Sequence, residues 1–345
     1  MVLLNCVDFA SHFVMFYSKV KRKIQCHLCP HQCQLQEGKA GLCGVRFNIG
    51  GRIRNKQQGL LSGMASDPIE KKPLYHYYPG KEIFSIGGFG CNLKCNFCQN
   101  WQISQVAEMD QLHGKILTAK EIVDRAMEKP NNIGIAFTYN EPTVWFEFMH
   151  EVATLAKAKG LKTVVVSNGY ILPEPLEALI SVIDAFNIDL KGFTENFYRD
   201  MAGGELEPVL ASLKMIKSYG KHLEITNLII PNKNDDSDTF MEMVKWIRIE
   251  LGNNTPLHLS KYFPRFKLSI PSTPDDTLIN LYHLAKKELN YVYLGNYHNP
   301  EYTSTYCPTC NHLIVERNGY SINLDDSFQG MECPKCKTHI PIKTD

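Results

Sequence analysis

The chain has 345 residues, of which 44% are hydrophobic and 21% are charged, with a net charge of +1 at pH 7. This composition fits a globular chain with a sizeable core, and the near-zero charge excludes a global field that would attract nucleic acid or an acidic membrane. No apolar run of about 18 residues or more is present, so a membrane-spanning helix is not expected. Eleven of the twelve cysteines, all but Cys6, fall into groups with metal-ligand spacing, which favours a reducing cytoplasm over a disulfide framework.

The sequence predicts three parts: residues 1–66, residues 67–298 and residues 299–345. The first part would begin with a helix that docks on the body, because Asp8 and His12 interrupt its apolar run and no basic n-region precedes it, unlike in a signal peptide. A four-cysteine metal module would follow, and its ligands are Cys26, Cys29, Cys33 and Cys43. Four thiolates accept either zinc or an auxiliary [4Fe–4S] cluster, and their spacing leaves both open.

From about residue 82 the chain alternates short apolar runs with amphipathic helical patterns. The apolar runs lie at 82–87, 132–138, 162–168, 185–190, 223–230, 256–263 and 291–295. Among the helices, one should begin at the capping box formed by Thr118 and Glu121, and another has Pro142 in its first turn. This alternation predicts an α/β fold with a parallel sheet covered by helices, in which ligands bind at the carboxyl ends of the strands.

The first predicted strand runs into GFGCNLKCNFCQN, residues 88–100, which carries Cys91, Cys95 and Cys98. Three thiolates suit three corners of a [4Fe–4S] cluster and leave the fourth iron without a protein ligand. S-adenosylmethionine (SAM) has an amine and a carboxylate that can chelate that iron. One electron then breaks a carbon–sulfur bond and releases a 5′-deoxyadenosyl radical. The alternative is a three-cysteine zinc site that a distant histidine completes.

The segment CNLKCNFC matches the Cys-x3-Cys-x2-Cys signature of radical SAM enzymes. Further matching segments are GVRFN (44–48), DPIEKKPLYHYYPG (67–80), FTYNEPT (137–143), SNGY (167–170) and NIDLKGF (187–193). With them the chain resembles the radical SAM enzyme of the AmmeMemoRadiSam system, which lies near the pyruvate formate-lyase-activating enzymes. The resemblance implies a partial, TIM-like barrel of six βα units, and partners with AMMECR-like and Memo-like domains. Reduced flavodoxin or ferredoxin would supply electrons.

The resemblance also implies the residues that hold SAM. Asn140 and Glu141 sit where the activating enzymes have a Gly-Gly-Glu-Pro segment that meets the SAM amino group. The alternative for Glu141 is a carboxylate that a helix N-terminus stabilises. Asn168 would lie near the SAM ribose or carboxylate. Lys191 would pair with the SAM carboxylate and Asp189 would accept from an amine or hydroxyl, and the alternative is a mutual surface ion pair worth ~0–1 kcal/mol.

The last part of the chain carries CPTC at 307–310 and CPKC at 333–336. Two such knuckles predict a zinc ribbon. Its ligands would be Cys307, Cys310, Cys333 and Cys336.

Together these patterns predict a radical SAM enzyme that abstracts hydrogen from an unidentified substrate. The nearest alternative is an activating enzyme for a glycyl-radical enzyme. A non-catalytic protein with several zinc sites is a weaker alternative, because the chain lacks the basic, aromatic-rich stripes of a nucleic-acid-binding protein.

Overall fold

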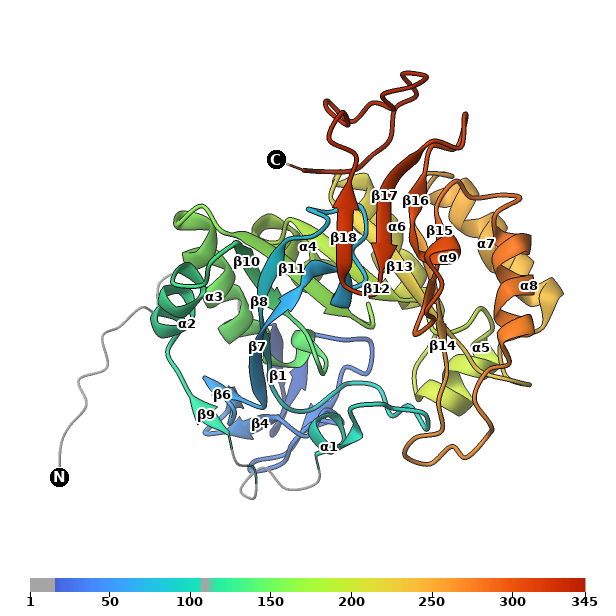
Figure 1. Cartoon of the computed structure of the whole chain (residues 1–345). Helices are drawn as coiled ribbons and strands as arrows, with labels where there is room; N and C mark the ends of the chain where they lie inside the picture. The colour runs from blue at the N-terminus through green and yellow to red at the C-terminus, as the bar shows by residue number, and fades with distance from the viewer. Residues whose placement is uncertain (1–15, 107–111, 113, 345) are drawn as a thin grey trace.

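The computed structural model describes residues 16–106, 112 and 114–344. The helix predicted at the start of the chain, and Cys6 with it, therefore lies almost wholly outside the described residues. Figure 1 shows a central sheet and its helices, with the N-terminal strands β1 and β4 on one side and the C-terminal strands β17 and β18 on the other.

The central sheet has eight strands, and the seven from β8 to β15 run parallel to one another. Their order is β15 (Val292–Gly295), β14 (Leu257–Lys261), β13 (His222–Ile229), β12 (Ala185–Asp189), β11 (Lys162–Ser167), β10 (Asn132–Phe137), β8 (Glu82–Gly87) and β7 (Gly63–Pro68). Each of the seven apolar runs forms one parallel strand, so the predicted α/β fold with a parallel sheet is confirmed. The antiparallel strand β7 was not predicted. In the part of the chain that the structure describes, β7 and β15 are the two edges of the sheet.

Helices connect the parallel strands, except that η1 lies between β7 and β8 and α9 follows β15. The longer ones are α2 (Ala119–Met127), α3 (Phe146–Ala158), α4 (Pro173–Val182), α6 (Glu207–Ser218), α7 (Ser237–Glu250) and α8 (Asp275–Ala285). The shorter ones are η1 (Ile69–Lys71), α1 (Trp101–Ser104), η3 (Pro142–Trp145), α5 (Glu195–Phe197), η4 (Tyr198–Ala202) and α9 (Pro300–Thr303). The predicted capping box is present, because the Thr118 side chain accepts from Glu121 N and the Glu121 carboxylate accepts from Thr118 N. No helix among the described residues is long and apolar enough to cross a bilayer.

Pro142 begins a turn of 3-10 helix instead of the predicted α-helix, and α3 starts four residues later. The Glu141 side chain accepts a hydrogen bond from Thr143 N and so caps this turn.

The segment between β7 and β8 fills one face of the sheet. Ala136, Val164 and Ala185 are small residues on three neighbouring strands, and they are fully buried. Side chains of the preceding segment pack against them in one cluster, and these are Ile69, Leu74, Tyr77 and Tyr78. The small residues leave room for the tyrosines, so these four side chains form part of the core. Gly134 allows β10 and β11 to pair, because a Cβ there would lie 1.8 Å from Lys162 O.

Small sheets flank the central one. The N-terminal module, residues 16–61, contains β1 (Tyr17–Val20), β2 (Lys23–Cys26), β3 (Gln34–Leu35), β4 (Arg46–Ile49), β5 (Arg52–Asn55) and β6 (Leu60–Leu61), which pairs with β9 (Lys115–Ile116). The C-terminal ribbon, residues 305–344, contains β16 (Thr305–Tyr306), β17 (Leu313–Asn318) and β18 (Ser321–Leu324). In the ribbon, Ile314 and Val315 pack against Tyr291, which precedes strand β15, and Tyr293, which lies in it.

Candidate functional site

The cysteine loop, residues 88–100, leaves the carboxyl end of β8 and is fixed at its start by Asn140 and by Gln57 of the N-terminal module. Asn140 Oδ1 accepts from Gly88 N at 3.1 Å, and Asn140 Nδ2 donates to Gly90 O at 2.8 Å. Gly90 has a φ of +83°, and a Cβ there would lie 2.6 Å from Cys43 O of the N-terminal module. The start of the loop is therefore held by the segment after β10 and packed closely on the module.

Further contacts hold the middle of the cysteine loop. Lys94 N donates to Ala202 O at 2.7 Å, which ties the loop to η4. Asn92 Nδ2 donates to Tyr170 O at 2.6 Å, which ties it to the segment after β11. Cys95 is buried between these contacts, and Cys91 and Cys98 are half-buried.

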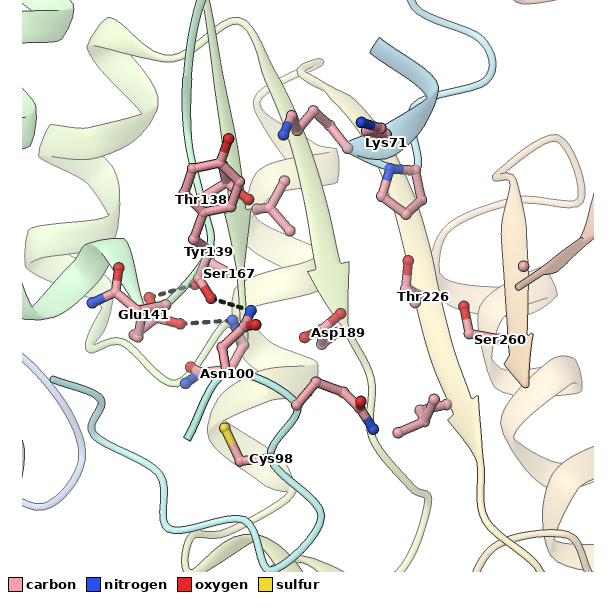
Figure 2. Close-up of a pocket in the computed structure, with 18 of the residues that line it drawn as sticks. Lys71, Cys98, Asn100, Thr138, Tyr139, Glu141, Ser167, Asp189, Thr226 and Ser260 are labelled. Carbon is pink, nitrogen blue, oxygen red and sulfur yellow. Dashed lines mark hydrogen bonds between the residues drawn. The ribbon is translucent and has the colours of Figure 1, made fainter. Parts of the chain in front are cut away.

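A pocket opens beside the loop (Figure 2). Its volume of about 650 Å³ is within the usual range for small-molecule sites, about 300–1,000 Å³. All eight residues that the sequence assigned to the cluster and SAM line it, and these are Cys91, Cys95, Cys98, Asn140, Glu141, Asn168, Asp189 and Lys191. They lie at or just after the carboxyl ends of β8, β10, β11 and β12. The pocket therefore lies at the carboxyl ends of the parallel strands, where ligands were expected.

Glu141 is buried and its carboxylate bonds to the protein itself. Oε1 accepts from Thr143 N at 2.9 Å and from Ser167 Oγ at 2.8 Å, and Oε2 accepts from Asn168 N at 2.8 Å (Figure 2). Burial raises the pKa of Glu141, and these three donors oppose the rise. The capping role that the sequence offered as the alternative is thus present, and the carboxylate retains further acceptor capacity.

Asn168 lies against the sulfur of Cys91. Its Nδ2 is 3.6 Å from Cys91 Sγ and 2.9 Å from Asn92 Oδ1, and its Oδ1 accepts from Tyr170 N at 2.8 Å. The side chain is therefore fixed on both sides, and it presents an N–H donor to the thiolate position.

Asp189 and Lys191 form an ion pair at 2.9 Å on the wall of the pocket. Burial lowers the pKa of Lys191, but the charges of Asp189 and Cys95 more than reverse this, so the pKa lies above its usual value. Lys191 is therefore a permanent cation beside the cysteine loop. The mutual pairing that the sequence offered as the alternative is present, and it is more buried than a surface pair because the Lys191 side chain is 15% exposed.

A second charged group lines the other half of the pocket. Asp67 at the end of β7 accepts from Lys72 Nζ at 2.8 Å and from Tyr139 Oη at 2.7 Å. Lys71 Nζ lies 3.2 Å from the other carboxylate oxygen. Burial favours the neutral acid, but these donors outweigh it and lower the pKa of Asp67 to about 2.

His258 also lines the pocket, and the sequence analysis did not assign it a role. Its Nε2 lies 2.7 Å from Glu224 Oε2, and Glu224 also accepts from Tyr75 N at 3.0 Å and His76 N at 2.8 Å. Burial favours the neutral form of Glu224, but hydrogen bonds from its histidine neighbours keep its pKa well below the usual value. The sequence carried a signal for His258, because side chains two residues apart in a strand point to the same face. Ser260, two residues after His258 in β14, lines the same pocket.

The three cysteine groups differ in the spacing of their sulfur atoms. Among the described residues, one group of potential metal ligands has all its ligand atoms within 4.8 Å of one another. It is the ribbon group of Cys307, Cys310, Cys333 and Cys336. The thiols of Cys91, Cys95 and Cys98 share one pocket wall but are more widely spaced, as a cubane cluster with separate iron corners requires. These thiols fit such a cluster better than a single zinc ion.

The N-terminal cysteines Cys26, Cys29, Cys33 and Cys43 line a second, smaller cavity. This cavity lies directly behind the cysteine loop, because Asn92 is part of its wall. The four cysteines that the sequence grouped together are therefore brought together by the fold.

The model of the Radical SAM superfamily matches residues 85–247. Uncharacterized protein MJ0808 of Methanocaldococcus jannaschii is 44% identical over 334 residues, which cover 95% of this chain and 98% of that protein. The pyruvate formate-lyase-activating enzyme of Clostridium pasteurianum is 24% identical over 185 residues, which cover 50% of this chain and 75% of that enzyme.

Among solved structures, a radical SAM methyltransferase from Sphaerobacter thermophilus has a TM-score of 0.51 at 15% identity, covering 68% of this chain and 71% of that one. This likeness supports the fold alone. The family match and the sequence relatives identify the chain: it belongs to the radical SAM superfamily and is an enzyme of the radical SAM type. Membership implies a [4Fe–4S] cluster and SAM as cofactors.

Proposed function

We propose that Cys91, Cys95 and Cys98 hold the [4Fe–4S] cluster and that the adjoining pocket holds SAM and a substrate. When bound, the cluster would supply one electron to cleave SAM, and the 5′-deoxyadenosyl radical so formed would abstract hydrogen from the substrate. The observation that carries the proposal is that these three thiols share one pocket wall with the Asp189–Lys191 pair.

The residues around the loop have distinct roles in this proposal. Lys191 binds the SAM carboxylate as a permanent cation, and Asp189 accepts from a hydroxyl or amine of SAM. Glu141 accepts from the SAM amino group with the lone pairs that its protein bonds leave free. Asn168 donates to the sulfur of Cys91, and Asn140 keeps the start of the loop in place.

The half of the pocket away from the cysteine loop would bind the substrate. Its walls carry Asp67, Lys71, Lys72, His258 and, from the ribbon, Tyr320. A pocket wall with charges of both signs favours a polar substrate, because an apolar one would remove water from these charged groups without giving them a further hydrogen bond.

The other two cysteine groups are metal sites in this proposal, and the ribbon would bind zinc. Its Cys307–Cys336 and Cys310–Cys333 sulfur pairs lie 3.5 and 3.6 Å apart. Four sulfurs around a tetrahedral zinc are about 3.8 Å apart, given a Zn–S distance of about 2.3 Å. The N-terminal module would bind either zinc or an iron–sulfur cluster.

The finer family assignment also remains part of the proposal. The motifs of the cysteine loop and of residues 67–80 support membership in the AmmeMemoRadiSam system, with AMMECR-like and Memo-like partners, a reduced flavodoxin or ferredoxin as the electron donor, and a cytoplasmic location. The chain would divide into 1–66, 67–298 and 299–345. An activating enzyme for a glycyl-radical enzyme is the second candidate, and the similarity to the pyruvate formate-lyase-activating enzyme favours it.

The test is anaerobic reconstitution with iron and sulfide, followed by dithionite and SAM. We expect 5′-deoxyadenosine to form, and Cys95→Ala to abolish it, while Cys6→Ala, which changes a cysteine outside the three groups, should not. A protein that binds zinc but no iron or sulfide under these conditions would refute the proposal. A glycyl radical signal in a candidate partner would support the second candidate, and deuterium entering 5′-deoxyadenosine from a candidate compound would identify the substrate.

A further inference from the structure

The N-terminal cysteines resemble the cysteine loop, and differ from the ribbon, in how far apart their sulfur atoms lie. Cys26, Cys29, Cys33 and Cys43 line one cavity, yet no three of these described residues bring their sulfurs within 4.8 Å of one another. A zinc ion requires sulfurs about 3.8 Å apart. A cubane places an iron atom behind each thiolate, which separates the sulfurs to about 6 Å. The spacing therefore favours a cluster over zinc.

The walls of this cavity add a second observation. Arg46 lines it and is 2% exposed. Its Nη1 and Nη2 donate to Glu147 at 2.7 and 2.8 Å, but among the described residues its Nε has no hydrogen-bond partner. A buried N–H without an acceptor is costly, so a ligand that supplies an acceptor is expected. A cluster carries sulfide as well as thiolate sulfurs, and with four thiolates it is an anion that the Arg46 charge would stabilise.

The module and the cysteine loop are joined by a short path. His31, which lies between Cys29 and Cys33 in the chain, has its Nε2 2.8 Å from Asn92 O. Asn92 is the neighbour of Cys91, and it lines the N-terminal cavity. One hydrogen bond therefore connects the two cysteine groups, through Asn92 next to Cys91 and through His31 two residues from both Cys29 and Cys33.

We propose that Cys26, Cys29, Cys33 and Cys43 hold a second [4Fe–4S] cluster, through which single electrons reach the three-cysteine site. The electron-entry role rests on the function proposed above, whereas the identity of the metal centre does not. Each transfer oxidises a reduced flavodoxin or ferredoxin by one electron and reduces the three-cysteine site by one electron, through the second cluster, and no atom is exchanged.

The surface of the module suits such a donor. Cys29 and Cys33 are half-buried and Leu42 is 54% exposed, so the cavity lies near the surface. Between residues 17 and 56 Glu37 is the single acidic residue. Exposed basic residues of that stretch are Lys19, Lys21, Arg22, Lys39, Arg52, Arg54 and Lys56. A basic module on a nearly neutral chain would steer an acidic electron carrier to this face.

The metal assignment is tested with the triple variant C91A/C95A/C98A, which leaves the N-terminal cysteines intact. After anaerobic reconstitution we expect about four iron and four sulfide atoms per chain, with one zinc from the ribbon, and a dithionite-reduced EPR signal that SAM does not change. About two zinc atoms per chain without iron would overturn the proposal. This outcome does not depend on whether the enzyme cleaves SAM.

Electron entry is tested with Cys33→Ala in the otherwise native chain. Iron should fall from about eight to about four atoms per chain, and the remaining EPR signal should still respond to SAM. The rate of 5′-deoxyadenosine formation with reduced flavodoxin, divided by the rate with dithionite, should fall relative to the native chain. An unchanged ratio at halved iron content would overturn the electron-entry role, and failure of both reductants in the native chain would instead count against the proposed function.

A charge-reversal variant provides a check that leaves every cysteine in place. K21E/R22E should raise the flavodoxin concentration needed for half-maximal rate and weaken its dependence on salt, while the dithionite rate stays the same. An unchanged flavodoxin dependence would exclude this surface as the docking face.

Discussion

The cysteine loop and the C-terminal ribbon carry similar residues but are built differently. In the ribbon, four cysteines from two knuckles converge until their sulfurs are within 4.8 Å, and strand pairing between β16, β17 and β18 supports them. In the cysteine loop, three cysteines are spread along the wall of a pocket of about 650 Å³. Their positions depend largely on contacts from the segments after β10 and β11 and from η4.

This difference explains what each region can do. A closed set of four ligands satisfies a metal and leaves no position for a substrate, so it stabilises structure. An open set of three, as proposed for the loop, would leave a coordination position for a small molecule, so it would take part in chemistry. The contacts that hold the loop come from several segments of the α/β domain, whereas the ribbon's cysteines lie beside its own strands, and the ribbon bonds to residues 75–78 and packs on β15.

The sharpest test of this contrast is Cys95→Ala. Loss of one of three ligands should remove the cluster, so 5′-deoxyadenosine formation should fall to the background of the assay. The measurement is product formation with dithionite and SAM alongside the iron content. If this variant retained a substantial rate of 5′-deoxyadenosine formation, the cluster that cleaves SAM would not be held by the cysteine loop.

Cys310→Ala should act on folding and not on the chemistry of the loop. Zinc binding supplies about 10 kcal/mol or more to the folding of small metal sites, so the ribbon should open and lose about one zinc atom per chain. Metal analysis and limited proteolysis between residues 307 and 336 will detect this. Loss of the loop's iron in this variant would mean that the two regions are not independent.

Asn140→Ala tests whether the loop depends on its neighbours. The variant removes both bonds to Gly88 and Gly90, and loss of a group that orients metal ligands typically lowers activity by about 10–100-fold. Cluster retention during gel filtration should fall with the rate. Asn253→Ala, a change at an exposed asparagine, is the matched control, and equal behaviour of the two variants would contradict the clamping role.

Lys191→Met tests the proposed contact with the SAM carboxylate. Loss of this cation should weaken SAM binding by about tenfold, or about 1.4 kcal/mol, as measured by equilibrium dialysis with the reconstituted protein. Lys214→Met, at an exposed lysine, is the control. If SAM affinity is the same in both, Lys191 pairs with Asp189 alone.

The smallest expected effect concerns the attachment of the ribbon. His76 Nε2 lies 2.6 Å from Tyr293 Oη, which lies 2.8 Å from Thr305 Oγ1 of β16, and burial lowers the pKa of His76 to about 3. The folded protein therefore keeps His76 neutral where the unfolded chain binds a proton, so stability falls as the pH drops below about 6.5. Between pH 7 and 5.5 this amounts to about 1 kcal/mol.

Urea unfolding of His76→Gln should show a correspondingly weaker pH dependence than the native chain, while His298→Gln, at an exposed histidine, should not. The same slope in all three proteins would exclude His76 as the source.

Much of the fold could be predicted because the signals were local. Each parallel strand coincides with a short apolar run, and the Thr118–Glu121 pair correctly marked the start of α2. Strand β7 was missed because its sequence GMASDP has few strand-forming residues, and its pairing with β8 is what makes it a strand. Helix α4 was not assigned although Pro173 and Pro175 lie in its first turn, a position that favours proline.

The site was predictable where it follows strand ends and not where it depends on long-range contacts. All eight assigned residues line the pocket, because parallel strands end at one edge. His258 could line a pocket or the core on the sequence alone and was left unassigned, because its contact with Glu224 joins residues 34 apart on neighbouring strands. The Glu141 bonds to Ser167 and Asn168 likewise depend on the order of β10 and β11, which the sequence does not state.

The wall of the pocket has a consequence for synthesis of the protein. Its residues run from Asp67 to Tyr320 along the chain, so a ribosome must translate past position 320 before the cavity can close. The cysteine loop emerges more than two hundred residues earlier. During that interval the pocket wall around the three thiols is incomplete, so a cluster bound there would be exposed to oxygen. Delivery of the cluster after release of the finished chain would avoid this exposure.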